Sequence, residues 1–341
     1  MSKYKEMLKF NEDEYRKSAE LIIEAYPIAK KVADEISVEG YENIFFSAVG
    51  GSLAPMMAIG EIAKQITKKP IFIEQAAELL TRGHKSLSNN SILITLSKSG
   101  DTKETVAMAK YAKENGIRVI SLTKELNSPL ALNSNYVIPM RHENGVEYEY
   151  MLLFWLFFRL MENNGDFSEY EKFAEQLKKL PENLLEAKYK FEPIAKEIGK
   201  KYYKEPYMIW IGSGETWGET YLFSMCLLEE MQWIKTKSVT SSEFFHGTLE
   251  LIQDKVPVFI IKGEDEFRKQ DNRVEEFCKK INCQYVVFDP AEYAVRLDNE
   301  FRKFISPMIT TATLTGRLSR HYEAYTKHNL QYRRYYRQFE Y

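Results

Sequence analysis

The segment of residues 242–250 contains His246, one of five histidines in the 341-residue chain. Two phenylalanines precede this histidine, Glu243 stands three positions before it and Gly247 follows it. A histidine that a carboxylate orients in an apolar setting can move protons near neutral pH. The same residues also suit a helix start with Ser242 as N-cap, in which His246 has no chemical role. This segment alone leaves both interpretations open.

A second segment, residues 97–102, reads Ser-Lys-Ser-Gly-Asp-Thr and joins a predicted strand at 91–96 to a predicted helix at 103–115. Hydroxyl groups, a glycine and the free N–H groups of a helix start are donors that bind phosphate. A polar loop that only caps its helix fits the same residues. Residues 50–52 (Gly-Gly-Ser) also follow a predicted strand and open a helix. Ligands of parallel sheets bind at the carboxyl ends of strands, so these two loops predict a phosphate site.

The second half of the chain repeats this pattern with one difference. The pairs Gly50 and Gly212, Ser97 and Lys262, and Arg118 and Gln284 are 162, 165 and 166 positions apart. This nearly constant offset indicates two similar units in tandem. The loop at 262–266, however, reads Lys-Gly-Glu-Asp-Glu, and acidic side chains repel phosphate. We therefore expect one productive phosphate site, in the first half.

Two adjacent carboxylates, Glu229 and Glu230, lie on a predicted helix at 215–235. Helical spacing gives Glu230 an apolar set of neighbours: Phe223, Cys226, Leu227, Trp233 and Ile234. Burial in such surroundings raises the pKa of a carboxylate toward the range of a general base. Pairing with an arginine or lysine from elsewhere, or a position facing solvent, is the alternative.

Bulk composition limits the class of protein. Hydrophobic residues make up 44% and charged residues 28% of the chain, and its length suits about two domains. A formal net charge of -2 argues against nucleic-acid binding. The longest apolar run, 151–158, is too short to cross a membrane. Three cysteines without disulfide or metal spacing predict a cytoplasmic protein with no metal, and the absence of Gly-x-Gly-x-x-Gly predicts no dinucleotide cofactor.

The alternation of strands and helices predicts an α/β fold with two parallel, doubly wound sheets. We expect residues 1–165 to hold the N-terminal helices and the first sheet, and residues 166–341 to hold the second sheet, further helices and a tail. A strand at 136–139 contains a proline and is expected at a sheet edge. Helices are expected at 1–38 and over 146–203, the latter with breaks at 163–165 and 181–183.

The C-terminal residues 328–341 mix arginines with aromatic side chains. Such a tail can stack on RNA. The acidic balance of the chain instead favours a packed tail that helps to close a site.

With these features in place, the chain resembles the SIS, or sugar isomerase, domain family. The resemblance rests on the two glycine-serine turns, the Ser-x-Ser-Gly-x-Thr segment at 97–102, the Glu-x-x-His-Gly segment at 243–247 and the arginine-rich ending at 328–341. More narrowly, the chain looks like the tandem-SIS fructosamine 6-phosphate deglycases, which are relatives of the isomerase half of glucosamine-6-phosphate synthase. The resemblance implies two tandem SIS domains, each a flavodoxin-like parallel sheet flanked by helices.

The resemblance also implies a phosphate site. The family's phosphate loop falls on Ser97, Ser99 and Thr102, with Ser52 contributing. Gly51 and Lys98 are further candidates for substrate binding, and Lys98 can add a positive charge near the phosphate or the amino-acid part.

The catalytic glutamate of the family falls on Glu230, and its ring-opening histidine falls on His246, 16 positions later. Glu243 is a further candidate for substrate binding. Two positions depart from the pattern: Thr248 and Leu330 stand where many relatives have proline. Both departures bear on the choice of subfamily, and neither removes a reacting group.

The activity implied is the cleavage of a 6-phosphorylated sugar–amino acid conjugate to a hexose 6-phosphate and a free amino acid, without a cofactor. An aldose–ketose phosphosugar isomerase or an amino-sugar phosphate deaminase would use the same residues. A protein that senses sugar phosphates without turnover is the alternative of another class. The family's histidine can reach the site of a neighbouring subunit, which implies a homodimer with a composite site. No nucleic-acid or membrane partner is expected.

Overall fold

The computed structural model of the protein describes residues 6–143, 145–293 and 296–340. Tyr341, part of the resemblance above, lies outside the described residues, as do residues 1–5 of the helix expected at 1–38. The chain forms two compact units, which we call the N-terminal unit (residues 12–181) and the C-terminal unit (residues 1–11 and 182–341). The chain passes between the units at residues 11–12 and again at residues 181–182, whereas the boundary expected from the sequence follows residue 165.

The N-terminal unit is built on a parallel sheet in the order β2-β1-β3-β4-β5. The strands are β1 (Asn43–Ala48), β2 (Ile71–Gln75), β3 (Ser91–Leu96), β4 (Arg118–Thr123) and β5 (Tyr136–Pro139). Every residue of β1 and β3 is buried, as expected for central strands covered on both faces. The predicted edge position of the proline-containing strand is confirmed.

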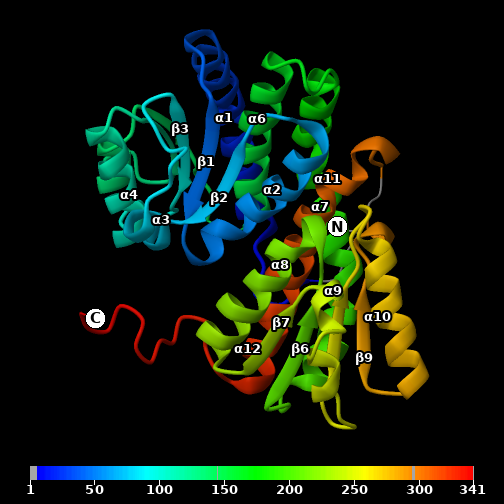
Figure 1. The fold of residues 1–341 in the computed structure, drawn as a ribbon. Coiled ribbons are helices and arrows are strands. Elements are labelled where there is room, and N and C mark those ends of the chain that lie inside the picture. The colour runs from blue at the N-terminus through cyan, green and yellow to red at the C-terminus, as the bar shows by residue number, and fades with distance from the viewer. Residues whose placement is uncertain (1–5, 144, 294–295, 341) are drawn as a thin grey trace. The chain divides into compact units, whose positions relative to one another are not determined.

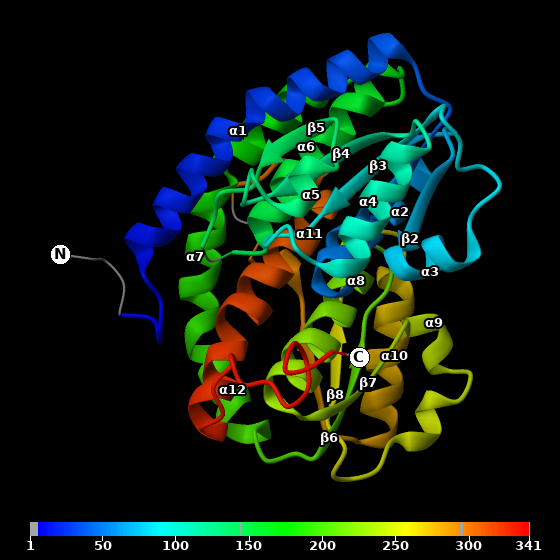
Figure 2. The same cartoon turned by 90° about the vertical axis from the view of Figure 1, so that its left-hand side faces the viewer.

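Helices cover both faces of this sheet because alternate residues of each strand point to opposite sides. The helices are α1 (Glu12–Glu39), α2 (Ala54–Ile66), α3 (Ala76–Arg82), α4 (Lys103–Glu114), α5 (Pro129–Leu132) and α6 (Glu147–Asn163). Phe45 packs in one core cluster with residues of α3 and α4, which Figure 2 shows side by side. Its neighbour Phe46 points the other way and contacts Phe157 of α6, with ring centroids 6.2 Å apart.

The C-terminal unit repeats the arrangement in a parallel sheet of order β7-β6-β8-β9 (Figure 1). Its strands are β6 (Tyr207–Ile211), β7 (Lys235–Val239), β8 (Val258–Ile261) and β9 (Tyr285–Phe288). The order matches the first four strands of the N-terminal unit, which confirms the predicted tandem α/β fold. Ile209 and Ile211 of β6 face α10 (Arg268–Ile281) and α9 (Ser241–Phe244), whereas Trp210 faces Phe223 on the other side.

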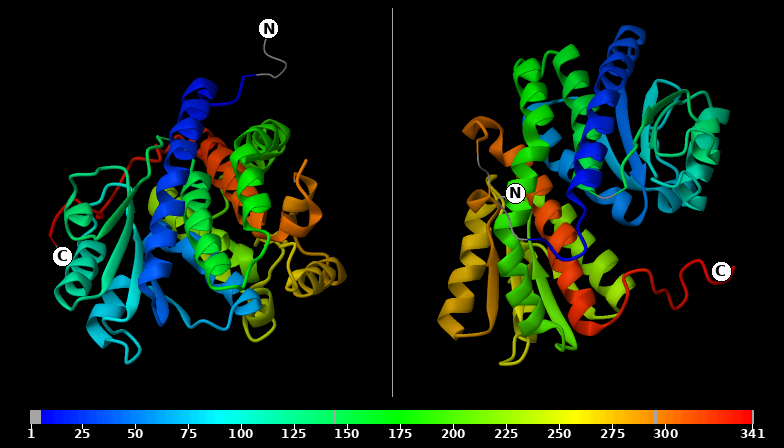
Figure 3. Two further views of the ribbon diagram at one scale, coloured as in Figure 1. Left: turned by 90° about the horizontal axis from the view of Figure 1, so that it is seen from above. Right: turned by 180° about the vertical axis from the view of Figure 1, so that it is seen from behind.

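Several helical segments differ from the expected ones. The expected helix at 215–235 begins with a 3-10 turn at Gly214–Thr216, continues as α8 (Trp217–Tyr221) and becomes a π-helix at Leu222–Met231. A second π-helix, Thr311–Leu318, joins α11 (Arg302–Thr310) to α12 (Ser319–Thr326). After α12 the chain runs on as a coil to residue 340 (Figure 3).

The expected break at 181–183 is wrong, because α7 (Tyr170–Tyr202) continues through Pro181. A proline inside a helix costs about 3 kcal/mol. The apolar positions Leu177, Leu180 and Leu184 keep helical spacing across the proline, and all three are buried. Their burial outweighs the lost hydrogen bond. Of the helices in the described part of the chain, none is both long and apolar enough to cross a membrane.

A buried ion pair ties the start of the chain to the C-terminal unit. Glu192 on α7 binds Arg317 (Oε2 to Nε, 2.6 Å), whose side chain is only 1% exposed. The backbone N–H of Leu8 donates to Oε1 of Glu192 (3.0 Å), and His321 lies 3.0 Å from the same oxygen. Burial favours the neutral acid, but the hydrogen bonds from His321, Arg317 and Leu8 outweigh it and lower the pKa of Glu192 to about 2.

Glu192→Gln should therefore lower the free energy of unfolding by about 3 kcal/mol near neutral pH, because it leaves Arg317 buried without its counter-charge. A carboxylate whose pKa falls on folding stabilises the fold above its unfolded pKa of about 4.5 and stops doing so as pH falls toward 2. The difference between wild type and variant in denaturant titrations should shrink over that range. Glu197→Gln, an exposed position on the same helix, is the control. Equal effects of the two substitutions would contradict the account.

Candidate active site

Parallel pairing of β1 with β3 brings the two predicted phosphate loops to one edge of the N-terminal sheet. Ser47 of β1 lies opposite Thr95 of β3, so residues 50–53 and 97–102 leave neighbouring strands at their carboxyl ends. Strand β2 lies on one side of β1, and β3 lies on the other side, so the direction in which strands are added to the sheet reverses after β2. Such a reversal of strand order is where ligands bind in open α/β sheets.

The 97–102 loop is preorganised by its own hydroxyl groups. The Oγ of Ser97 and the Oγ1 of Thr102 are 2.9 Å apart, and the N–H of Gly100 donates to Ser97 Oγ (3.1 Å). Ser99 is exposed, and its hydroxyl donates to the carboxylate of Asp101. Thr102 is the N-cap of α4 but makes no side-chain capping bond. The first N–H groups of α4 are thus not capped by that side chain and can bind an anion.

The neighbouring turn, Gly50–Leu53, is a 3-10 helix that leads directly into α2. Gly50 has a φ of +55°, a left-handed conformation that glycine adopts at little cost. Gly51 and Ser52 are half-buried. The structure thus brings Gly51, Ser52 and the 97–102 loop to the same sheet edge, as the sequence predicted.

Lys98, within the 97–102 loop, is half-buried and its side chain is held by a backbone carbonyl. Its Nζ donates to the backbone carbonyl of Glu143 (2.7 Å). Burial lowers the pKa of Lys98, and the charges of Glu149 and Glu143 partly oppose this shift. His142 and Glu149, both almost fully buried, lie 3.5 Å apart (Nε2 to Oε1). Neither residue belongs to a sequence motif, so sequence reasoning missed this pair beside Lys98.

In the C-terminal unit, carboxylates occupy the corresponding sheet edge. Oδ2 of Asp265 accepts the N–H of Glu215 (2.8 Å), at the start of the helical segment that follows β6. Asp271 accepts a hydrogen bond from Ser241 Oγ and one from the N–H of Gly263 (3.1 Å). Burial raises the pKa of Asp271 to about 7, although those two hydrogen bonds oppose the shift. Burial is the main cause that raises the pKa of Glu215 well above its usual value, and the negative charge of Asp265 raises it further. Protein carboxylates here take the place that a phosphate would need.

Glu230 lies near the end of the π-helix Leu222–Met231, and its surroundings differ from the predicted apolar face. Its side chain is 32% exposed, and Oε1 is 2.9 Å from Nε of Arg333 in the C-terminal tail. The adjacent Glu229 is exposed and accepts a hydrogen bond from Thr236 (2.5 Å). The α-helical spacing assumed for Glu230 fails because the π-helix adds residues to each turn. The alternative that Glu230 pairs with an arginine or lysine from elsewhere in the chain therefore applies, and Arg333 is that partner.

An open cavity of about 800 Å³ surrounds this ion pair. Carboxylates, cations and aromatic rings of the C-terminal unit line it: Glu229, Glu230, Trp233, Ile234, Lys235, Thr236, Arg333, Arg334, Tyr335, Tyr336 and Phe339. Part of the 328–341 tail therefore forms a wall of the cavity that contains Glu230.

His246 is exposed and follows α9, between that helix and the 3-10 turn Thr248–Leu251. Thr240, not Ser242, caps α9: its hydroxyl accepts the N–H of Glu243 (3.3 Å). The side chain of Glu243 is exposed. The N–H of His246 donates to the backbone carbonyl of Glu243 (2.9 Å), so the hydrogen bond described between these two residues joins their backbones and not the carboxylate and the imidazole.

Within one chain, β7 separates Glu230 from His246. Glu230 precedes the amino end of β7, and His246 follows its carboxyl end. A strand of this length spans about 16 Å. The π-helix packs on the Trp210 face of the sheet through Phe223, whereas Phe244 packs on the opposite face beside Ile209. The two predicted catalytic residues therefore come from opposite ends of the strand and from segments on opposite faces of the sheet.

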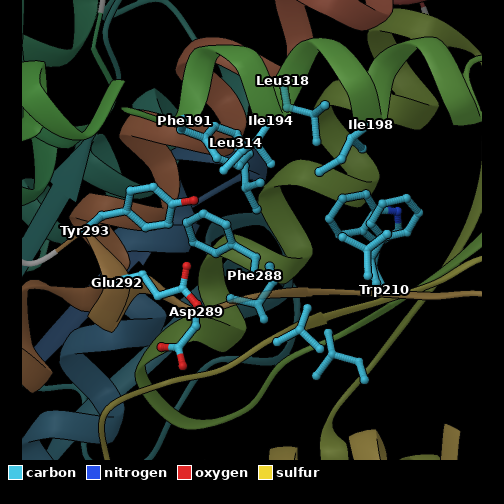
Figure 4. A pocket seen from close by; sticks show the side chains of 15 residues that line it. Phe191, Ile194, Ile198, Trp210, Phe288, Asp289, Glu292, Tyr293, Leu314 and Leu318 are labelled. Atoms are coloured by element: carbon cyan, nitrogen blue, oxygen red, sulfur yellow. The ribbon is translucent and has the colours of Figure 1, made fainter. Parts of the chain in front are cut away.

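A smaller cavity of about 110 Å³ lies in the same unit between α7, the sheet and the π-helix Thr311–Leu318. Figure 4 shows it ringed mainly by aromatic and aliphatic side chains, among them Phe191, Trp210 and Phe288. The carboxylates of Asp289 and Glu292 lie at one side. None of the predicted site residues lines this cavity, so we assign it to packing of the core.

The chain is similar to known proteins over most of its length. The SIS domain family model matches residues 39–157, within the N-terminal unit. Fructosamine deglycase FrlB of Bacillus subtilis (strain 168) is 30% identical over 308 residues, covering 88% of this chain and 93% of that protein. Fructoselysine 6-phosphate deglycase of Escherichia coli (strain K12) is 22% identical, covering 91% and 90%.

A solved structure has the same fold. A Bacillus subtilis protein solved under the name of a phosphosugar isomerase superimposes with a TM-score of 0.88 at 26% identity, covering 96% of this chain and 100% of that one.

The loop geometry predicts different costs for two glycine substitutions. Gly100 has a φ of +69°, and a Cβ there would lie 2.1 Å from Oγ of Ser128. Gly50 has a similar φ of +55° with nothing within 4 Å of a Cβ. Gly50→Ala should cost only backbone strain, about 1–2 kcal/mol. Gly100→Ala should cost about 2 kcal/mol more because of the steric clash. Denaturant titrations of both variants measure the difference, and equal costs would show that the loop is not packed as described.

Proposed function

The chain belongs to the SIS domain family, and we propose that it is a deglycase that cleaves a 6-phosphorylated sugar–amino acid conjugate. The products are a hexose 6-phosphate and a free amino acid. The observation that carries the proposal is the hydroxyl cradle of Ser97 and Thr102 at a helix start without a side-chain cap. The similarity to two deglycases over about nine-tenths of the chain supports the choice of substrate class.

In this proposal the phosphate docks on Ser52, Ser97, Ser99 and Thr102, with the backbone of Gly51 beside them. Lys98 supplies a positive charge from within the loop. The phosphate takes no part in bond breaking, so its binding energy serves to position the reacting carbons. The carboxylates at the equivalent edge of the C-terminal unit support a single phosphate site per chain.

His246 assists ring opening by moving a proton between the ring oxygen and the hydroxyl, and Glu243 helps to bind the substrate beside it. Glu230 then takes a proton from the carbon that bears the amine and returns it to the neighbouring carbon. The double bond moves with this transfer and leaves an imine. Water adds to the imine, and the carbon–nitrogen bond breaks to release the amino acid. The scheme consumes one water and balances without a redox partner.

We propose further that the protein is a homodimer whose active sites are composite. The placement of Glu230 and His246 at opposite ends of β7 supports this, because one chain does not bring them together by local structure. A second copy can supply its exposed His246 to the Glu230 of the first.

An aldose–ketose phosphosugar isomerase is the second candidate, since its chemistry needs the same proton transfer and a similar structure bears that name. The test is an assay of the purified protein on fructoselysine, glucoselysine and fructose-asparagine 6-phosphates, glucosamine 6-phosphate and fructose 6-phosphate. Mass spectrometry follows free amine and hexose phosphate. Amine release from a glycated amino acid supports the deglycase. Interconversion of hexose phosphates alone would identify an isomerase, and binding without turnover would identify a sensor.

The composite site predicts complementation. Glu230→Gln and His246→Ala should each be nearly inactive alone. Mixing the two variants under conditions of subunit exchange should restore about a quarter of wild-type turnover, because half of the dimers then contain one intact site of two. Co-purification of one variant through an affinity tag on the other, or native mass spectrometry, confirms exchange into mixed dimers. Absence of recovery in verified mixed dimers would show that both residues act within one chain.

A further inference from the structure

The partner of Glu230, Arg333, is held in place by backbone oxygens. Its Nη1 donates to the carbonyls of Leu330 (2.7 Å) and Tyr332 (2.9 Å). The side chain is 16% exposed, and Nε binds Glu230. Among the described residues no hydrogen bond uses Nη2 of Arg333, which leaves part of the guanidinium available to a ligand.

The tail segment that carries Arg333 is itself anchored to the C-terminal unit. Nε2 of Gln232 donates to the carbonyl of His328 (2.7 Å), and the ring of His328 packs against Trp233 at 4.3 Å. Leu330 is buried, and its N–H donates to Glu323 (3.3 Å). These contacts hold the tail segment in place on both sides of Arg333, so the guanidinium has a fixed position in the cavity wall.

The ion pair has a consequence for the proposed chemistry. While Nε of Arg333 holds Oε1 of Glu230, that oxygen is occupied by a hydrogen bond and is less available to take a proton from carbon. A guanidinium presents its donors in a planar fork that suits a carboxylate with two hydrogen bonds. A second carboxylate that entered the cavity would compete with Glu230 for this fork.

We propose that Arg333 binds the carboxylate of the amino-acid part of the substrate and thereby releases Glu230 for proton transfer. The inference rests on the proposed function and names the residue that grips the amino-acid end. In an amino acid linked through its α-amine, three bonds separate the reacting sugar carbon from the carboxyl carbon, a reach of about 4 Å. Arg333 and Glu230 are in direct contact, so a substrate beside Glu230 brings its carboxylate within range of Nη2.

The test compares two ligands that differ only in the carboxylate. The 6-phosphorylated sugar conjugates of glycine and of methylamine, both reduced at the sugar carbonyl, bind without turnover. Calorimetry on the full-length wild type should show the glycine conjugate bound about 100-fold more tightly. Arg333→Gln should reduce this ratio to about threefold or less while leaving the affinity for the methylamine conjugate nearly unchanged.

Arg337→Gln is the matched control, since it removes one charge from an exposed position of the same tail. It should keep the wild-type ratio. Equal weakening of both conjugates by Arg333→Gln would overturn the proposal and assign Arg333 to folding of the tail. Wild-type binding without preference for the carboxylate would overturn it as well. Amine release from the unreduced conjugates is measured separately, so failure of the proposed deglycase activity is distinguished from failure of the role of Arg333.

Discussion

The parallel pairing of β1 with β3 is the constraint on which the proposed phosphate site depends. Parallel neighbours end at the same edge of a sheet, so the turns after Ala48 and Leu96 must emerge together. Each turn also begins a helix, and a helix start offers N–H groups without partners in the helix. The sheet therefore gathers two sets of donors at one point before any ligand is present. Ser97 and Thr102 add hydroxyl groups to donors that the backbone already provides.

The same architecture appears twice, but in the proposed function only the N-terminal copy binds the phosphate. In the C-terminal unit Asp265 accepts the N–H of Glu215, and Asp271 accepts that of Gly263. These carboxyl groups satisfy the donors from within the protein, so the donors are not available to a phosphate. That unit instead carries Glu230 and the arginine-bearing tail. Duplication thus provides two similar scaffolds, and in the proposed function the first supplies phosphate binding and the second supplies the proton-transfer group.

Much of this organisation follows from local sequence. Most of the strands, their tandem repeat and the edge position of Pro139 follow from apolar runs and turn residues, and the donor loop at 97–102 follows from its hydroxyl residues and glycine. Strand β7 is an exception, because its residues do not form an apolar run. Features that depend on contacts between residues far apart in the sequence could not be predicted from local sequence. The π-helix at 222–231 changes which side chains surround Glu230, and the spacing of apolar residues in the sequence does not predict it. Arg333 lies about a hundred positions from Glu230, so only the folded tail reveals their contact. Pro181 stays within α7 because burial along the helix outweighs its local preference.

Glu230 is the group proposed to move the proton, and its substitution is the most direct test of the mechanism. Turnover of a glycated amino acid 6-phosphate should be compared for wild type, Glu230→Gln and Glu229→Gln, with binding of the reduced methylamine conjugate, which has no carboxylate to pair with Arg333, as a check on folding. Both variants lose one carboxylate from the same cavity wall. We expect Glu230→Gln to lose about 1000-fold in kcat with little change in binding, and Glu229→Gln to lose far less. Full turnover by Glu230→Gln would contradict the mechanism.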